Sequence, residues 1–218
     1  MFFEPDASGP RPSVDAGARS LMRDSPPMRT LAATDSCEAG PGVLQRSILH
    51  LGAGRKYHRE AVNVDLVADT NPDVVHDLDQ VPWPFTDGRF REVWAYDVLE
   101  HLDDVVAAMD EIHRVCAPGA VVRVTVPHFS CSNAFTDITH RRFFSFFSFH
   151  YFTGENEFTF YTRSRFRRRG TRIIFRPTLL NKLVWRLANR YPARYEQRWA
   201  WMFPAWYLYF ELEVVKGS

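Results

Sequence analysis

The residues best suited to hold a ligand are a pair of glycines and a carboxylate that follow two apolar runs. Residues 47–51 read as a buried strand and lead into Gly52-Ala53-Gly54. Glycine has no Cβ, so the backbone of such a turn can pass close to a bound molecule. Residues 61–65 form the next predicted strand, and Asp65 at its end can accept two hydrogen bonds from a ribose diol. The pattern predicts a site for a cofactor that contains adenosine.

A second group of reactive side chains follows the longest β-branched run. His128 comes directly after that run, and Asp137 and His140 lie three residues apart in the segment that follows. At this spacing a carboxylate and an imidazole share one face of a helical turn, and the carboxylate raises the basicity of the ring and fixes its tautomer. Group transfer to a hydroxyl or a protonated amine requires loss of a proton. We therefore predict that His128 or His140 is a general base and that Asp137 orients it.

Neighbouring residues extend this prediction to the substrate. Arg141 can hold an anionic group, and we expect Phe129 and Phe144 to contact the substrate as well. Two other interpretations stay open, because Asp137 and His140 could instead pin a lid loop, and the aromatic residues from 143 to 152 could be core packing. His128, Asp137 and His140 also form an N/O ligand set, but without a tight spacing signature, so no metal site is predicted.

These side chains need a sheet whose strands end at one edge. Apolar and β-branched runs predict strands at residues 47–51, 61–65, 73–77, 91–96 and 120–126. Apolar residues at helical spacing predict a helix that is capped by Asp103 or Asp104 and ends at Pro118-Gly119. Alternating strands and helices imply a layered α/β domain with right-handed crossovers and ligands at the carboxyl ends of the strands. Gly52, Asp65, Asp77, Asp97 and His128 should therefore converge on one crevice.

The glycine turn also indicates which cofactor it binds. Dinucleotide sites use three spaced glycines before a helix, and here the third glycine position is Tyr57. The second strand begins almost at once, which leaves little room for that helix, and a phosphate-binding Walker A motif is absent. A cofactor with adenosine but no phosphate fits better, which favours S-adenosylmethionine (SAM).

Five segments together resemble class I SAM-dependent methyltransferases of the small type-11-like kind, over roughly residues 46 to 130. Each segment is weak alone, but their order and spacing also match that family. The matching segments are His50-Leu51-Gly52-Ala53-Gly54, Asn63-Val64-Asp65, Asp77-Leu78 with residues 81–85 and 87–90, Val98-Leu99-Glu100-His101-Leu102, and residues 112–120.

The resemblance implies a fold and a set of cofactor contacts. The implied fold is a Rossmann-like, three-layer α/β/α sandwich with about seven mostly parallel strands. This sequence departs from the family pattern in one respect, because the usual helix after the glycine turn is shortened or missing. Gly52, Ala53 and Gly54 would border the methionine and ribose, Asp65 would bind the ribose hydroxyls, Asp77 and the Leu78 backbone would contact the adenine, and Asp97 and Val98 would border the methionine end. For Glu100 and His101 a charge pair at a helix start is the commoner interpretation.

The two ends of the chain have different compositions. Residues 1–42 are rich in Pro, Gly, Ser, Ala and Asp and predict a flexible tail, whereas residues 43–218 form the methyltransferase domain. Within it we expect a substrate loop at residues 127–152 and a C-terminal insert at residues 177–207. We also predict strands at residues 172–175 and 208–216 and a helix at residues 179–189.

An arginine-rich run and an aromatic segment stand out in this C-terminal part. The first spans residues 163–176 and the second residues 199–207. They could dock on an anionic surface such as lipid headgroups, a lipid-linked saccharide or RNA. They could also be a solvated strand face and a buried aromatic cluster. Because the net charge of the whole chain is close to zero, the second interpretation is favoured.

Bulk properties agree with an ordinary globular protein. The chain has 218 residues, 45% hydrophobic content and a net charge of +1, which gives no argument for nucleic acid as a partner. Three cysteines without CxxC spacing favour a reducing cytoplasm. We expect no spanning helix and no signal peptide, and peripheral membrane contact and a homodimer stay open.

We therefore predict a SAM-dependent methyltransferase that acts on an O, N or S nucleophile of a small polar metabolite or saccharide intermediate. One alternative is transfer of another group from SAM, such as the aminocarboxypropyl group. The other is a catalytically silent binding or scaffold module with the same fold.

Overall fold

The computed structural model describes residues 45–155, 162 and 164–217. All of these residues belong to one compact unit of the chain. The predicted flexible tail, residues 1–42, lies outside the described residues.

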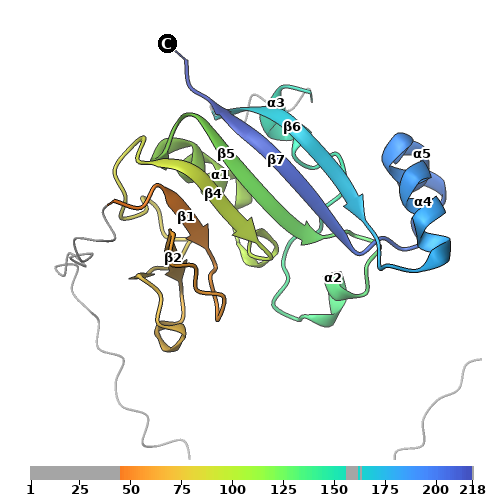
Figure 1. Ribbon diagram of the computed structural model, residues 1–218, viewed down its shortest axis with the longest axis horizontal. Helices are drawn as coiled ribbons and strands as arrows, with labels where there is room; N and C mark the ends of the chain where they lie inside the picture. Colours follow the sequence, from red (N-terminus) through yellow and green to blue (C-terminus); the bar gives the residue numbers. More distant parts are fainter. Residues whose placement is uncertain (1–44, 156–161, 163, 218) are drawn as a thin grey trace, which may run out of the picture. The chain divides into compact units, whose positions relative to one another are not determined.

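A single sheet of seven strands organises this unit, in the order β3-β2-β1-β4-β5-β7-β6 (Figure 1). The five strands from β3 to β5 run parallel, and β7 pairs antiparallel with both β5 and β6. The predicted Rossmann-like, mostly parallel sheet is confirmed. The strands are β1 (Ile48–Leu51), β2 (Ala61–Asp65), β3 (Val74–Val75), β4 (Phe90–Tyr96), β5 (Cys116–Pro127), β6 (Arg165–Ile174) and β7 (Tyr207–Val215).

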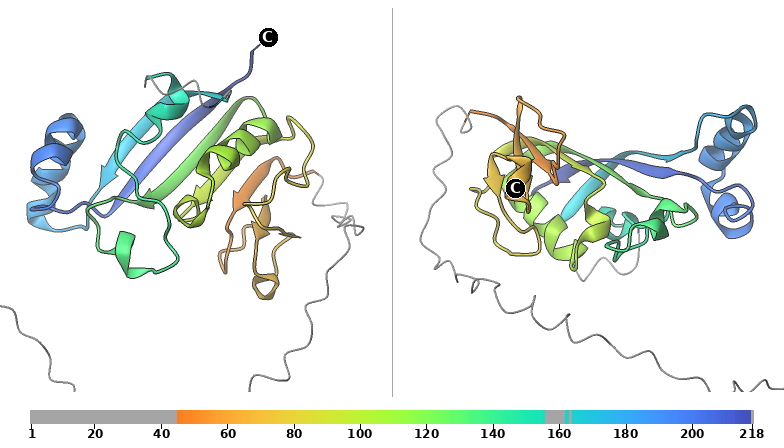
Figure 2. Two further views of the ribbon diagram at one scale, coloured as in Figure 1. Left: turned by 180° about the vertical axis from the view of Figure 1, so that it is seen from behind. Right: turned by 90° about the horizontal axis from the view of Figure 1, so that it is seen from below.

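Helices cover one face of this sheet. In Figure 2, α1 and the two short helices α2 and α3 lie on the same side of the strands. The strands alternate accordingly: Val122 and Val124 of β5 are buried, whereas Arg123 between them is partly exposed on the opposite face. Over β4, β5 and β7 the described residues place no helix on that opposite face, so the three-layer form implied by the resemblance is incomplete in this part of the chain. The helices are α1 (Val105–Val115), α2 (Asn133–Thr136), α3 (His150–Thr153), α4 (Leu179–Arg190) and α5 (Pro192–Arg198).

Helix α1 forms for the reasons that the sequence indicated, but it ends earlier. The Asp104 carboxylate caps it by accepting hydrogen bonds from the backbone N–H groups of Val106 and Ala107, at 2.9 and 3.0 Å. The helix ends at Val115 because Cys116 already pairs with Phe90 of β4. Pro118-Gly119 therefore lies within β5, where the register with β4 shifts, and does not end the helix.

Two elements differ from prediction near the C-terminus. Strand β6 takes in most of the arginine-rich run, because Arg167 and Arg169 pair with Glu213 of the neighbouring β7. Helix α5 was not predicted, although Pro192 stands at its first position, where proline is favoured. Helices α4 and α5 lie beyond the end of β6 and the start of β7 (Figure 1). Among the described residues no helix is both long and apolar enough to cross a membrane.

Candidate functional site

The predicted cofactor residues meet at the carboxyl ends of three neighbouring parallel strands. Gly52 follows β1, Asp65 ends β2 and Asp97 follows β4, and these strands are adjacent in the order β2-β1-β4. No helix separates β1 from β2, since residues 52–60 form only turns. The shortened connection that the sequence predicted is confirmed.

Both glycines of the turn have a backbone conformation that favours glycine, and Gly52 has a steric requirement as well. Gly52 and Gly54 have φ of +59° and +49°, a region that L-residues with a side chain rarely adopt. A Cβ on Gly52 would lie 2.6 Å from Val98 Cγ2, so the turn and the segment after β4 pack together too closely for any side chain. A Cβ on Gly54 would meet nothing within 4 Å. The backbone at Gly54 therefore faces open space, as a cradle for a ligand must.

The Asp65 carboxylate is held in place by the turn that it faces. Its Oδ2 accepts a hydrogen bond from Gly54 N at 2.7 Å, and its Oδ1 accepts one from Val67 N at 2.9 Å. Each oxygen keeps a second lone pair, and the side chain is partly exposed. A fixed carboxylate of this kind suits the two hydroxyls of a ribose, so the chemistry of the turn fits SAM.

The next cofactor residues flank this pair. Asp77 is partly exposed and accepts a hydrogen bond from Asp79 N at 3.1 Å. The Leu78 side chain is buried in the core, and its carbonyl accepts a hydrogen bond from the Trp83 indole at 3.1 Å, which fixes the loop.

Asp97 lies between a pocket and the carboxyl ends of strands β2, β1 and β4, where Gly52 and Asp65 stand and which we call the cofactor edge. Its φ is +56°, and the strain of this conformation is offset by hydrogen bonds that both its N–H and its carboxylate form with Thr125, at 2.9 and 3.0 Å. Its side chain also lines an open pocket of about 550 Å³. The other lining residues are Glu100, His101, Asn133, Thr136, Asp137, Ile138, His140 and Tyr207.

Asp137 and His140 therefore lie together at this pocket, as predicted. His140 Nε2 is 4.0 Å from Asp137 Oδ2, and its Nδ1 is 3.3 Å from the Ala134 carbonyl oxygen. Because a carbonyl only accepts, the neutral ring carries its proton on Nδ1 and leaves the Nε2 lone pair free. The Asp137 Oδ1 accepts a hydrogen bond from the Thr139 hydroxyl at 2.7 Å.

Glu100 and His101 belong to the same cluster. The Glu100 side chain is 1% exposed, and neither carboxylate oxygen has a hydrogen-bond partner. Burial, together with the negative charges of Asp97 and Asp137, raises the pKa of Glu100 to about 8. Burial and the neighbouring His140 lower the pKa of His101. The sequence signal was the Glu100-His101 pair of the resemblance, which the commoner interpretation took as a charge pair at a helix start.

His128 does not belong to this cluster. Its side chain is fully buried, its Nδ1 accepts a hydrogen bond from Ser130 N at 3.1 Å, and its Nε2 lies 3.1 Å from Glu196 Oε1 of α5. With both ring nitrogens occupied, the ring ties the end of β5 to α5. This geometry argues against the predicted role of His128 as a base.

The predicted substrate residues are placed differently as well. Phe144 is buried and stacks on Phe149, so it belongs to the core, and Phe129 packs between the His128 ring and Trp201. The Arg141 guanidinium forms an ion pair with Asp103 near the start of α1. None of the three is among the residues that line the pocket described above.

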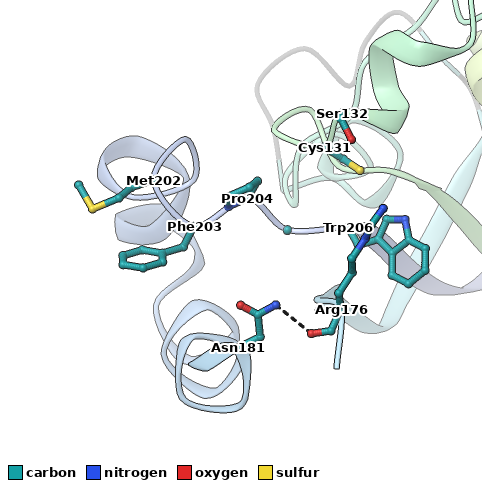
Figure 3. A pocket seen from close by; sticks show the side chains of 9 residues that line it. Cys131, Ser132, Arg176, Asn181, Met202, Phe203, Pro204 and Trp206 are labelled. Carbon is teal, nitrogen blue, oxygen red and sulfur yellow. Dashed lines mark hydrogen bonds between the residues drawn. The ribbon is translucent and has the colours of Figure 1, made fainter. Parts of the chain in front are cut away.

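A second pocket, of about 400 Å³, is lined in part by Cys131 and Ser132, the two residues that precede Asn133 of the first pocket. In Figure 3, Cys131 and Ser132 lie on one side of it with Trp206 and Arg176 below them, and Phe203 and Pro204 lie on the other side. The Arg176 guanidinium lies over the Trp206 ring, 4.9 Å from its centre. The backbone carbonyl of Arg176 accepts a hydrogen bond from Asn181 Nδ2 at 2.9 Å. Since Trp206 lines this pocket and Tyr207 lines the first, the two pockets are neighbours.

Comparisons with known proteins agree with this geometry. Residues 39–124 match the model of a family described as "Methyltransferase domain". No curated protein matches the sequence.

Solved structures show the same fold at low sequence identity. A SAM-dependent methyltransferase from Archaeoglobus fulgidus is 15% identical, with a TM-score of 0.55 over 79% of this chain and 88% of that one. The YcgJ protein from Bacillus subtilis is 13% identical, with a TM-score of 0.50 over 84% of this chain and 97% of that one. Residues 39–124 are thus similar to a methyltransferase domain, the chain shares its fold with SAM-dependent methyltransferases of known structure, and the glycine–Asp65 cradle fits SAM as the cofactor.

Proposed function

We propose that the protein transfers a methyl group from SAM to an O, N or S nucleophile of a small polar metabolite or saccharide intermediate. The observation that carries this proposal is the pocket beside Asp97, because it adjoins the cofactor edge and is lined mainly by polar and titratable side chains. An acceptor with hydroxyl or amine groups can satisfy such a lining, whereas an apolar acceptor would leave it without partners.

The chain's own residues would hold the cofactor and position the acceptor. The backbone of Gly52, Ala53 and Gly54 would lie close to the bound SAM. Asp65 would bind its ribose, and Asp77 would contact its adenine. SAM supplies an electrophilic methyl carbon on a sulfonium. The protein then contributes mainly by holding the nucleophile in line with it. We assign removal of the acceptor's proton to the cluster that includes Asp137 and His140.

The two neighbouring pockets favour an acceptor longer than its reacting group. We propose that the nucleophile lies in the pocket at Asp97 and that the remainder reaches the pocket at Arg176. A guanidinium there suits an anionic substituent, such as a phosphate or a carboxylate.

Incubation of the protein with methyl-labelled SAM and fractionated metabolites tests the transfer directly by product mass. We expect a product heavier by one methyl group, and His140→Ala should abolish it while the affinity for SAM is kept. A product heavier by an aminocarboxypropyl group, with release of methylthioadenosine, would contradict methyl transfer. Absence of any product together with unconsumed SAM would indicate a silent module.

We further propose peripheral contact with an anionic membrane through the surface formed by α4, α5 and the turn after α5, which we call the α4–α5 surface. The aromatic segment was expected to be buried, but here Trp199, Trp201 and Met202 are 51%, 71% and 73% exposed. Only Ala188 is buried among the side chains described for α4. Residues 176–202 contain six basic side chains and one acidic one, Glu196, which faces His128. Aromatic and cationic side chains together suit the headgroup region of a lipid bilayer.

Co-sedimentation with phosphatidylcholine vesicles, with and without phosphatidylglycerol, tests this contact. We expect binding only to the anionic vesicles, weaker at high salt, and strongly reduced by Trp201→Ser/Met202→Ser. The exposed pair Leu66→Ser/Val67→Ser is the matched control and should bind normally. Binding to RNA but not to vesicles would contradict the proposal.

The cytoplasm is our proposed compartment, because Cys116 and Cys131 are free thiols.

A further inference from the structure

Three side chains at the pocket beside Asp97 bring potential metal ligands together. Glu100, His101 and His140 each place one ligand atom so that all three lie within 4.8 Å of one another. We propose that this cluster binds one divalent transition-metal ion, such as Zn²⁺, through one carboxylate and two imidazoles. The set differs from the combination of His128, Asp137 and His140 that the sequence offered, because His128 is occupied elsewhere.

Hydrogen bonds to the two rings leave a nitrogen free on each. The Thr139 hydroxyl donates its proton to Asp137 Oδ1 at 2.7 Å, so at 2.9 Å it can only accept from His101 Nδ1. The Ala134 carbonyl likewise accepts from His140 Nδ1 at 3.3 Å. Both Nε2 atoms therefore keep their lone pairs. Metal-binding histidines are held in this way, with the other ring nitrogen donating to an oxygen.

The buried carboxylate is the second, independent observation. Glu100 is 1% exposed and both of its oxygens lack a partner, although an unpaired buried carboxylate is strongly unfavourable. Among the described residues neither oxygen has a hydrogen-bond partner, and the nearby Asp97 and Asp137 add negative charge. A divalent cation would satisfy all of these groups at once.

The ligand number matches an open site. Coordination at about 2.0–2.2 Å requires ligand atoms within about 4 Å of one another, so small side-chain rotations would complete the site. Two histidines and one carboxylate leave further positions for water or substrate, and the pocket gives them room. This inference deepens the proposed function, on which the role of the ion rests. With the ion bound, His140 would be a ligand, the cation would lower the pKa of the acceptor hydroxyl, and Asp137 at the same pocket would take the proton as the methyl group is transferred.

Equilibrium dialysis of the tag-free protein against Zn²⁺ alone, followed by elemental analysis, tests the site without SAM or acceptor. We expect one tightly bound Zn²⁺ per chain, at least a 100-fold loss of affinity in Glu100→Gln and His140→Gln, and a 10- to 100-fold loss in Thr139→Val. His113→Gln, which changes a partly exposed histidine outside the cluster, is the matched control and should bind Zn²⁺ normally.

Calorimetry with SAM shows whether each variant is folded. Unchanged Zn²⁺ affinity in folded Glu100→Gln and His140→Gln, or no Zn²⁺ bound by the wild type, would overturn the metal site. Methyl transfer that persists in the presence of a chelator would support the proposed function and contradict a role of the ion in it. Conversely, bound Zn²⁺ with no transfer to any acceptor would support the site and contradict the function.

Discussion

Replacement of the two glycines of the cofactor turn by alanine should separate backbone strain from steric overlap. Both glycines have positive φ, which costs an L-residue roughly 1–2 kcal/mol. Gly54→Ala should lose about that much, because its Cβ meets open space. Gly52→Ala should lose about 1–3 kcal/mol more, because its Cβ would lie 2.6 Å from Val98 Cγ2 and 2.8 Å from Val98 Cβ.

Urea denaturation measures these losses, and a double-mutant cycle identifies their source. Val98→Ala keeps the Cβ that clashes, so Val98→Gly is the appropriate partner substitution. In the Gly52→Ala/Val98→Gly protein the steric part should vanish, which gives a coupling free energy of about 1–3 kcal/mol between the two sites. Equal destabilisation by Gly52→Ala and Gly54→Ala, or strict additivity in the cycle, would refute the close approach of the turn to Val98.

Two further predictions concern groups that position the site. Burial alone would raise the pKa of Asp73, but hydrogen bonds from Arg46, Asn63 and Tyr57 outweigh it and lower the pKa to about 2. The folded-state pKa is thus below the ordinary value, so about 2 kcal/mol of stability present above pH 4 should be lost as the pH falls toward 2. Urea midpoints measured across this range should show that loss in the wild type but not in Asp73→Asn, and an identical loss in both proteins would contradict it. Glu196→Ala should destabilise the fold by roughly 2–4 kcal/mol, because His128 Nε2 and Phe146 N both lose their acceptor. SAM calorimetry on the same variant should show nearly unchanged affinity, and a large loss of affinity would instead link His128 to the cofactor.

Most of the cofactor edge could be predicted because it depends on local features. A glycine turn after an apolar run and a carboxylate at the end of the next strand were visible in Gly52, Gly54 and Asp65. The end of α1 was predicted too late, since Pro118-Gly119 resembles a helix stop and the pairing of Cys116 with Phe90 is a long-range contact. The extent of β6 was missed for a similar reason, because its arginines are satisfied by Glu213 on the neighbouring strand.

The acceptor side could be predicted only in part. Asp137 and His140 are close in sequence, and their pairing follows from spacing. Glu100 lines the same pocket but comes from the segment after β4. His128 does not face the pocket, because its ring contacts Glu196, which lies 68 residues further along the chain. Such contacts between distant segments decide which side chains face the pocket, and no periodicity in the sequence encodes them.

Calorimetric titration with SAM, on the wild type and on Asp65→Ala, tests the central claim most directly. The account predicts one binding site per chain and a loss of about 1.5–3 kcal/mol in Asp65→Ala, which is roughly a 10- to 150-fold weaker affinity. Equal affinity of the two proteins for SAM would contradict the placement of the cofactor at the glycine turn and Asp65.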